Sequence, residues 1–250
     1  MFPIPFALGV WLLAVLGVAL GSFATVLVHR LPSGESISGR SRCPGCRKTL
    51  QWVDLVPVLS FLLLRGRCRR CHQFIALEYP ILEISSALVL ILPSMVSSSL
   101  TVLAVLQGLS LWVLLVVAVV DAKHQAVPDS LTLPLLVLAG FTAWNAPAFS
   151  VLAPLLGGGF FAAQWILSRG RWVGSADILV ATGIGILLGT LPSTILAIIV
   201  AYISGSLFAV ILLATRKATR TSRIAFIPFL ALGALIALLW GAQILQFFRL

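Results

Sequence analysis

Apolar stretches long enough to cross a lipid bilayer recur along the whole chain, and they constrain its fold more than any other feature. A helix needs about 20 residues to cross roughly 30 Å of hydrocarbon. Hydrophobic residues make up 60% of the 250 positions and charged residues only 10%, a balance far from that of a water-soluble domain. The chain is therefore predicted to fold within a membrane.

The apolar stretches are predicted to be helices. Every backbone polar group in lipid must be paired within the protein, which leaves helices and closed barrels as the possible structures. The stretches lack the alternation of polar and apolar residues that marks barrel strands. We therefore predict an all-α membrane protein with about eight transmembrane helices, the fourth and sixth of them short. The predicted spans are 5–28, 77–94, 100–120, 131–144, 149–167, 177–191, 194–215 and 226–248.

The distribution of Lys and Arg predicts the orientation of these helices. No basic residue precedes the first stretch, and His29 and Arg30 follow it, which favours a first span with its N-terminus outside over a secretion signal. Cytosolic loops collect Lys and Arg, and in this orientation all of the 17 Lys and Arg residues except Arg249 become cytosolic. Membrane topology thus explains the net charge of +10. A nucleic-acid-binding surface is the competing explanation, but these charges are scattered over loop ends.

Only one segment, residues 29–78, is long and polar enough to fold outside the bilayer. It holds all four cysteines, as Cys43-Pro-Gly-Cys46 and Cys68-Arg-Arg-Cys71. Two C-x-x-C pairs at this separation are typical of a four-cysteine zinc site, in which Zn²⁺ is structural because no ligand position stays open. The predicted domains are a first helix at 1–28, a cytosolic zinc domain at 29–78 and a helical domain at 79–250.

Two other uses of these cysteines compete with zinc binding. Structural disulfides are rare in the reducing cytosol, where the predicted topology places this segment. A thioredoxin-like redox pair accompanies a βαβ pattern, which a loop of this size and composition does not supply. Zinc is therefore the favoured interpretation, and a redox-active pair is the remaining alternative.

The few acidic residues include a candidate catalytic pair. Ionisable groups at membrane depth are costly, which makes them functional candidates. Asp121 and Asp177 both fall at the cytosolic ends of their predicted helices, so one pocket can hold both. Two carboxylates in one site share a proton, so one can activate water while the other protonates the leaving amine. An aspartic protease is one interpretation of this pattern, and a proton-coupled transporter is a rival.

A structural role competes with catalysis at some of these carboxylates. Val127-Pro128-Asp129-Ser130 resembles a helix start, where a carboxylate complements the helix dipole, and for Asp129 this role is favoured. The segment from Gly174 to Asp177 also resembles a turn that enters a helix. From the residues alone, both interpretations of Asp177 remain open.

From about Gly21 to the last predicted helix, the sequence resembles the type IV prepilin peptidases, a family of GxGD-type intramembrane aspartic proteases. The segment Asp121-x6-Pro128-Asp129-x-Leu131-Thr132-Leu133-Pro134 is similar to the one that carries the first catalytic aspartate of the family. The second aspartate, in a Gly-x-Gly-Asp pattern, falls on Asp177, and its first glycine on Gly174. The N-terminal motifs, in order, are Gly21-Ser22-Phe23, His29-Arg30-Leu31-Pro32, Cys43-Pro-x-Cys46, Asp54-x-x-Pro57-x-x-Ser60, Leu64-Arg65-Gly66-Arg67-Cys68-Arg69-x-Cys71 and Tyr79-Pro80-x-x-Glu83.

The resemblance implies catalytic roles for Asp121 and Asp177 and supporting roles for Asp129, Gly174 and Glu83. The implied reaction removes the short basic leader of type IV prepilins or pseudopilins after a glycine, at the cytosolic face of the bacterial inner membrane. Many members then methylate the new N-terminal residue with S-adenosylmethionine, an activity associated with the cysteine-bearing domain. The expected partners are these substrates and the lipid bilayer, without nucleic acid.

The sequence departs from the family pattern at three positions. Ala176 replaces the second glycine of Gly-x-Gly-Asp, Leu179 replaces a common Lys, and Thr25 replaces a common Asn. We expect the Ala176 methyl group to strain the turn, because glycine tolerates positive φ where alanine does not. These departures leave open an alternative function, namely a catalytically impaired homologue that acts as a pilin or secretion-system assembly factor.

Overall fold

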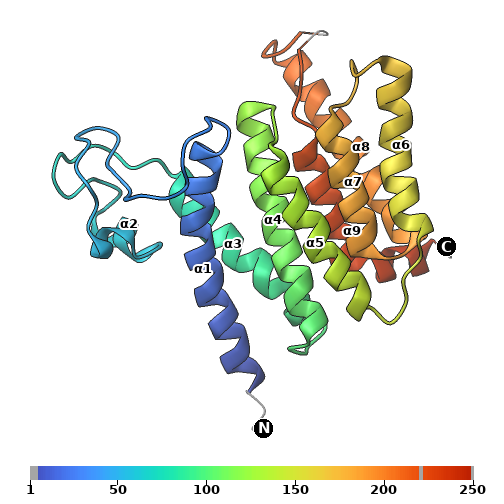
Figure 1. Ribbon diagram of the computed structural model, residues 1–250, viewed down its shortest axis with the longest axis horizontal. Coiled ribbons are helices and arrows are strands. Elements are labelled where there is room, and N and C mark those ends of the chain that lie inside the picture. The colour runs from blue at the N-terminus through green and yellow to red at the C-terminus, as the bar shows by residue number, and fades with distance from the viewer. Residues whose placement is uncertain (1–4, 220–221, 249–250) are drawn as a thin grey trace. The chain divides into compact units, whose positions relative to one another are not determined.

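The computed structural model describes residues 5–219 and 222–248 (Figure 1). Arg220 and Arg249, two of the Lys and Arg residues that predict the orientation of the helices, lie outside these residues. The long helices and two short ones follow one another along the chain. They are α1 (Phe6–Arg30), η1 (Trp52–Leu55), α2 (Leu59–Leu63), α3 (Glu78–Val96), α4 (Val102–His124), α5 (Asp129–Asn145), α6 (Leu152–Ser168), α7 (Ser175–Leu188), α8 (Leu191–Ala214) and α9 (Ile227–Phe247).

The structure confirms the all-α prediction. Each predicted span coincides with a helix, and the described residues contain isolated β-bridges but no strand. Five helices, α1, α3, α4, α8 and α9, are long and apolar enough to cross a membrane. Helices α5 and α6 have 17 residues each and α7 has 14, which is less than the roughly 20 residues of a full crossing.

The chain forms two compact units, residues 1–100 and 101–250. In the first unit, α1 packs along α3, and the segment between them carries η1, α2 and the cysteines. Gly17 and Gly21 face the backbone of α3 at Ala87 and Glu83, with no room for a side chain between the helices. Small residues permit this close approach of membrane helices. Helix α3, which the sequence groups with the C-terminal helices, thus pairs with α1.

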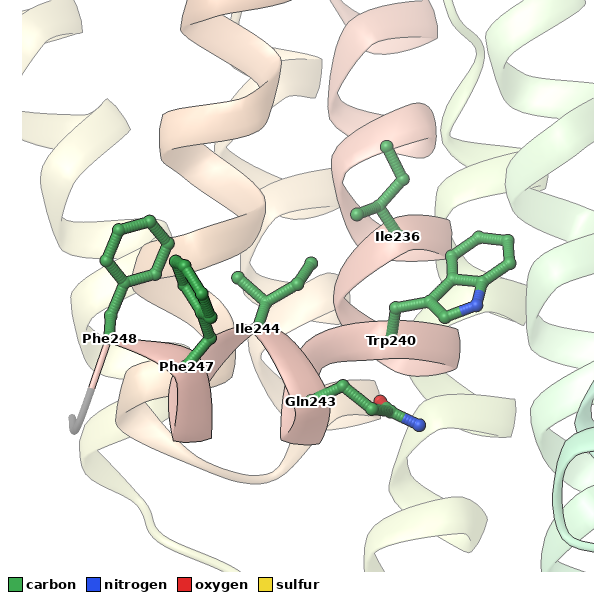
Figure 2. Close-up of a pocket in the computed structure, with 6 residues that line it drawn as sticks. All are labelled: Ile236, Trp240, Gln243, Ile244, Phe247 and Phe248. Carbon is green, nitrogen blue, oxygen red and sulfur yellow. The ribbon is translucent and has the colours of Figure 1, made fainter.

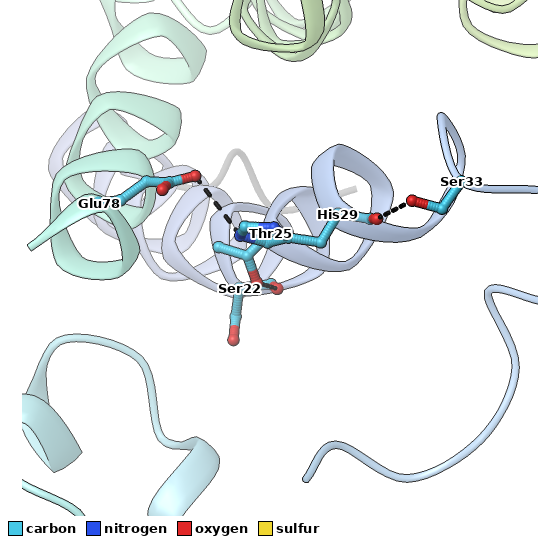
Figure 3. Close-up of polar contacts among 5 residues, drawn as sticks. All are labelled: Ser22, Thr25, His29, Ser33 and Glu78. Atoms are coloured by element: carbon cyan, nitrogen blue, oxygen red, sulfur yellow. Dashed lines mark hydrogen bonds and ion pairs between the residues drawn. The ribbon is translucent and has the colours of Figure 1, made fainter. Parts of the chain in front are cut away.

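Polar contacts join the end of α1 to the start of α3 (Figure 3). The Nε2 atom of His29 lies 3.5 Å from Oε1 of Glu78, and the His29 ring stacks on Tyr79. One turn earlier, the Thr25 hydroxyl donates to the Ser22 carbonyl at 2.7 Å. The Thr25 bond lies within α1, whereas the two His29 contacts hold the ends of the cysteine-bearing segment together.

The second unit is a bundle in which the short helix α7 lies at the centre, packed against α5, α6 and α9. Helix α4 packs against α5 and α9, and α8 pairs with α9. The core is formed by large apolar side chains from most of these helices, including Leu114, Leu135, Phe161, Val180 and Leu230. Because α7 is buried among other helices, it does not need to be as long as the bilayer is thick.

Glycines bring α6 against α7. A Cβ atom on Gly157 would lie 2.5 Å from the carbonyl oxygen of Ala181, and the site next to Gly158 is filled by Thr182. A Cβ atom on Gly159 would meet nothing within 4 Å. The first two glycines therefore serve close helix packing, and the third does not.

We predict that Gly157→Ala lowers the thermal stability and the turnover of the protein, because the added methyl group pushes α6 away from the helix that carries Asp177. The matched variant Gly159→Ala should unfold at the same temperature or higher, since alanine is favoured over glycine in a helix by about 1 kcal/mol. Thermal unfolding of both variants in the same detergent provides the comparison. Equal stability of the two variants would contradict this packing role.

Candidate active site

Asp121 is in the last turn of α4, where its side chain is 8% exposed. Its Oδ2 atom accepts a hydrogen bond of 3.0 Å from the N–H of Ile227, the first residue of α9. The N–H groups at a helix N-terminus have no partner within the helix and favour negative charge. A second bond, from the Gln125 amide to the Arg223 carbonyl, ties the end of α4 to the segment before α9. The Asp121 carboxylate is therefore fixed against the start of α9.

Asp177 occupies the first turn of α7 and is also 8% exposed. Its Oδ2 atom accepts a bond of 2.7 Å from the N–H of Gly174, so the side chain caps its own helix. Gly174, which has no side chain, contributes only backbone atoms. Asp177 thus has the capping role that the sequence allows, and this role does not exclude a catalytic one.

The two buried aspartates share one end of the bundle. The Asp121 carboxylate acts electrostatically on that of Asp177, and both belong to the second unit. Each carboxylate uses its Oδ2 atom in the bond described above, and the Phe226 N–H also bonds the Asp121 carboxylate. An ionised carboxylate has about four acceptor sites on its two oxygens, so these bonds leave room for a water molecule or a peptide. Asp129, by contrast, is exposed at the first position of α5, as expected of a residue at a helix start.

A polar pair and an aromatic cluster beside Asp177 are features that sequence reasoning missed. The Tyr202 hydroxyl of α8 donates to the Gln164 Oε1 atom of α6 at 2.9 Å, and Asp177 acts electrostatically on this tyrosine. The Tyr202 ring also packs on Phe161 and Phe226, the residue before Ile227. No sequence signal links these residues, because they come from α6, α8 and the residue before α9 and meet only in the folded bundle.

The cysteine segment consists of two similar hairpins. The Cys43 N–H donates to the Lys48 carbonyl at 3.0 Å, and in the second hairpin the Cys68 N–H donates to the Gln73 carbonyl at 2.9 Å. Antiparallel bridges close the two hairpins, between Arg42 and Thr49 and between Arg67 and Phe74. Each C-x-x-C pair thus stands on the same kind of tight turn.

The sulfur atoms are arranged as a metal site requires. The Sγ atoms of Cys43, Cys46, Cys68 and Cys71 lie within 4.8 Å of one another, and no disulfide joins them. The Sγ atoms of Cys43 and Cys71 are 3.8 Å apart. Zn–S bonds near 2.3 Å in a tetrahedron require S–S separations of about 3.8 Å. The four residues therefore fit a zinc ion.

Backbone N–H groups prepare one of these thiols for ionisation. Bonds from the N–H groups of Cys71 and Arg70 lower the pKa of Cys68 to about 6. The Gln73 N–H acts in the same direction on Cys71, but desolvation and bonds with the neighbouring thiols raise the pKa of Cys71 to about 11. Four thiols this close cannot all ionise without a cation among them, because their negative charges repel one another.

Glu83 lies in the first unit, buried between α1 and α3. Its Oε2 atom accepts a bond of 2.7 Å from the Val58 N–H, and the Ser22 side chain bonds the same carboxylate. Val58 has φ of 59°, a value rarely adopted by a β-branched residue. Glu83 therefore anchors an unusual turn of the cysteine-bearing segment to the helix pair.

The C-terminal half of α9 carries an apolar pocket (Figure 2). Its lining contains no acid, base or nucleophile, and it is far along the helix from Ile227. It does not contribute to the candidate site. The lining residues are Ile236, Trp240, Gln243, Ile244, Phe247 and Phe248.

Comparison with known proteins identifies the family. The profile of the Bacterial Peptidase A24 N-terminal domain matches residues 15–96, and that of the Type IV leader peptidase family matches residues 108–213. The prepilin leader peptidase/N-methyltransferase of Pseudomonas aeruginosa is 32% identical to the chain, over 92% of the chain and 90% of the relative. The chain belongs to the type IV leader peptidase family.

Other members of the leader peptidase family show comparable similarity. The prepilin leader peptidase/N-methyltransferase of Klebsiella pneumoniae is 34% identical, over 72% of the chain and 86% of the relative. The type 4 prepilin-like proteins leader peptide-processing enzyme of Escherichia coli is 33% identical to the chain, over 88% of the chain and 89% of the relative. No solved structure shows significant similarity to the chain. With its apolar helices, this family member is a multi-pass protein of the bacterial inner membrane.

The family matches divide the candidate residues in the same way as the structure does. The leader peptidase match contains Asp121 and Asp177, and the N-terminal match contains the four cysteines and Glu83. The carboxylate pair and the cysteine cluster therefore belong to separate units of this leader peptidase family member.

Proposed function

We propose that the chain is an aspartic endopeptidase that removes the leader peptide of type IV prepilins or pseudopilins, with Asp121 and Asp177 as its catalytic pair. The observation that carries this proposal is the burial of two interacting carboxylates at one end of the second unit. Relatives named prepilin leader peptidases support the substrate class. Cleavage follows a glycine, as the family resemblance implies.

The mechanism uses the acceptor sites that the backbone hydrogen bonds leave on the two carboxylates. Two adjacent carboxylates share a proton, so one is ionised and the other protonated. The ionised group removes a proton from water as the water attacks the scissile carbonyl carbon, and the protonated group gives its proton to the leaving nitrogen. The bonds from Ile227 and Gly174 hold both carboxylates in position during this exchange.

The orientation follows from the distribution of Lys and Arg. We place the N-terminus outside and both the zinc domain and the aspartate end of the bundle at the cytosolic face, because basic residues collect there. Asp129 and Gly174 support the pair, Asp129 by starting α5 and Gly174 through its N–H. Glu83 supports the zinc domain, since it binds the Val58 turn.

The domains have separate tasks in this proposal. Cys43, Cys46, Cys68 and Cys71 would hold Zn²⁺, which shapes a domain of residues 29–78 that is too small to build a core of its own. The helical part that begins at residue 79 contains the aspartate pair. The relatives are also named N-methyltransferases, so S-adenosylmethionine is the expected methyl donor. No feature of the described first unit identifies a site for this donor, and we assign no residue to methyl transfer.

Co-expression with a candidate prepilin tests the proposed function. Mass spectrometry of the N-terminus of the prepilin reports leader removal and any added methyl group in one measurement. We expect cleavage after a glycine when the chain is present and an intact leader when it is absent. An intact leader in both cultures, with a well-folded protein in the membrane, would favour the impaired homologue that acts as an assembly factor.

The backbone at Ala176 argues against such impairment. Ala176 lies within α7 and is not among the described residues with positive φ. The expectation that its methyl group strains the turn is therefore wrong, because the turn does not require the freedom of glycine there.

We predict that Ala176→Gly changes the rate of cleavage by less than about threefold and lowers the thermal stability slightly, since glycine costs about 1 kcal/mol relative to alanine in a helix. Initial rates with a purified prepilin and a melting curve measure both effects. A tenfold gain in turnover would show that alanine does strain this turn.

A further inference from the structure

The short helix α2 exposes its apolar side. Leu59, Leu62 and Leu63 are 53%, 64% and 73% exposed. They are spaced i, i+3 and i+4, so they share one face of the helix. Helix α2 packs against η1, whose Trp52 is 79% exposed. Trp52, Leu59, Leu62 and Leu63 together are called the outer apolar face below.

The opposite side of α2 packs against the rest of the zinc domain. The Phe61 ring lies against Gly66, where a Cβ atom would be 3.1 Å from Cζ of the ring. Gly66 itself bonds to Ile75 across the second cysteine hairpin. The leucines thus cannot turn inward without losing this packing. In a water-soluble domain such an apolar face points to the core, and an exposed one marks an interaction surface.

The position and charge of the domain indicate what covers this face. The segment leaves α1 at Arg30 and enters α3 at Glu78, and both helices are long and apolar enough to cross a membrane. The domain is therefore held at the membrane surface at both ends. Arg65, two residues after α2, and Arg70, in the second cysteine hairpin, are exposed and form no ion pair with a carboxylate of the described residues. Basic residues beside exposed Trp and Leu are typical of segments that lie in an anionic lipid interface.

We propose that the outer apolar face lies in the headgroup region of the bilayer, with Arg65 and Arg70 at anionic lipid phosphates. The membrane then completes the fold of the zinc domain and sets the height of the cysteine hairpins above the lipid. A basic peptide is disfavoured at this surface, because like charges repel. This inference does not depend on the proposed peptidase activity.

Quenching of Trp52 fluorescence by brominated lipids tests the proposal. The full-length chain and Trp52→Phe are reconstituted into bilayers of phosphatidylglycerol and phosphatidylcholine whose acyl chains carry bromine near the headgroup. The difference between the two emission spectra isolates Trp52 from the other tryptophans. We expect bromine to reduce this difference signal by at least about half, and aqueous acrylamide to affect it little.

A control position makes the result specific to one face. Lys48→Trp in the Trp52→Phe background adds a tryptophan at an exposed site of the first cysteine hairpin, and we expect acrylamide but not bromine to quench it. Three results would overturn the proposal. These are equal bromine quenching at both positions, quenching of Trp52 by acrylamide alone, and protection of Trp52 from both quenchers, which would show that protein covers the face. Bromine quenching of Trp52 that is no stronger with phosphatidylglycerol than without it would overturn the role of Arg65 and Arg70.

Discussion

Asp121→Asn and Asp177→Asn should each slow prepilin cleavage by about 10²–10⁴-fold. An amide neither accepts the proton of the attacking water nor donates one to the leaving nitrogen, and general acid–base catalysis contributes about that factor. Each asparagine can still accept the existing bond from Ile227 or Gly174 through its side-chain oxygen. The fold should therefore survive. Initial rates with purified protein and a synthetic or purified prepilin measure the loss.

Asp129→Asn is the matched control for these variants. Asp129 is exposed at the first position of α5, where its charge complements the helix dipole. This interaction is worth about 0.3–1 kcal/mol at an exposed site, so a measurable fraction of the activity should remain. If Asp129→Asn lost as much activity as Asp177→Asn, the catalytic pair would have to be assigned differently.

Cys68→Ser should remove the bound metal and unfold the zinc domain. A hydroxyl is a far weaker zinc ligand than a thiolate, and structural zinc contributes apparent free energies of about 10–16 kcal/mol to small domains. Elemental analysis should find about one zinc per native chain, because four thiolates saturate one tetrahedral site. The variant should contain much less. Hydrogen exchange should become fast at the Cys43 and Ile75 amides, which the two hairpins protect.

Arg70→Ser is the control for the cysteine variant, since Arg70 lies between the two ligands of the same hairpin and contributes only its backbone N–H to Cys68. The Arg70→Ser variant should keep its zinc and the slow hydrogen exchange of the Cys43 and Ile75 amides. Cleavage should persist in part in Cys68→Ser, because the aspartates belong to the other unit. Full metal content in Cys68→Ser would show that this cysteine is not a ligand.

The sequence predicted features that depend on composition and short spacing. Hydropathy located every long helix, because lipid requires each crossing segment to be apolar over its own length. The two C-x-x-C pairs predicted the cysteine cluster, since the ligands come from two local turns. The shortness of α7 could be predicted as well, but its central place in the bundle could not, because that depends on packing with α4, α5, α6, α8 and α9.

Long-range contacts at the aspartates could not be predicted in the same way. Nothing in the sequence links Asp121 to the Ile227 N–H or Gln164 to Tyr202, as each pair is brought together only by the bundle. At Ala176, reasoning from a family motif predicted backbone strain, whereas the helix simply begins one residue earlier, at Ser175. Whether Ala176 strains the backbone depends on the local backbone conformation, which a sequence motif does not specify.

Comparison of the single and double aspartate variants tests the catalytic pair most directly. The wild type, Asp121→Asn, Asp177→Asn and the double variant are assayed with one prepilin, and a monodisperse detergent profile with retained zinc shows that each is folded. Residues that act as a unit are non-additive. We predict that the double variant cleaves no more slowly than either single variant. Near-native cleavage by either single variant, or losses that multiply in the double variant, would contradict the assignment of Asp121 and Asp177 as one catalytic pair.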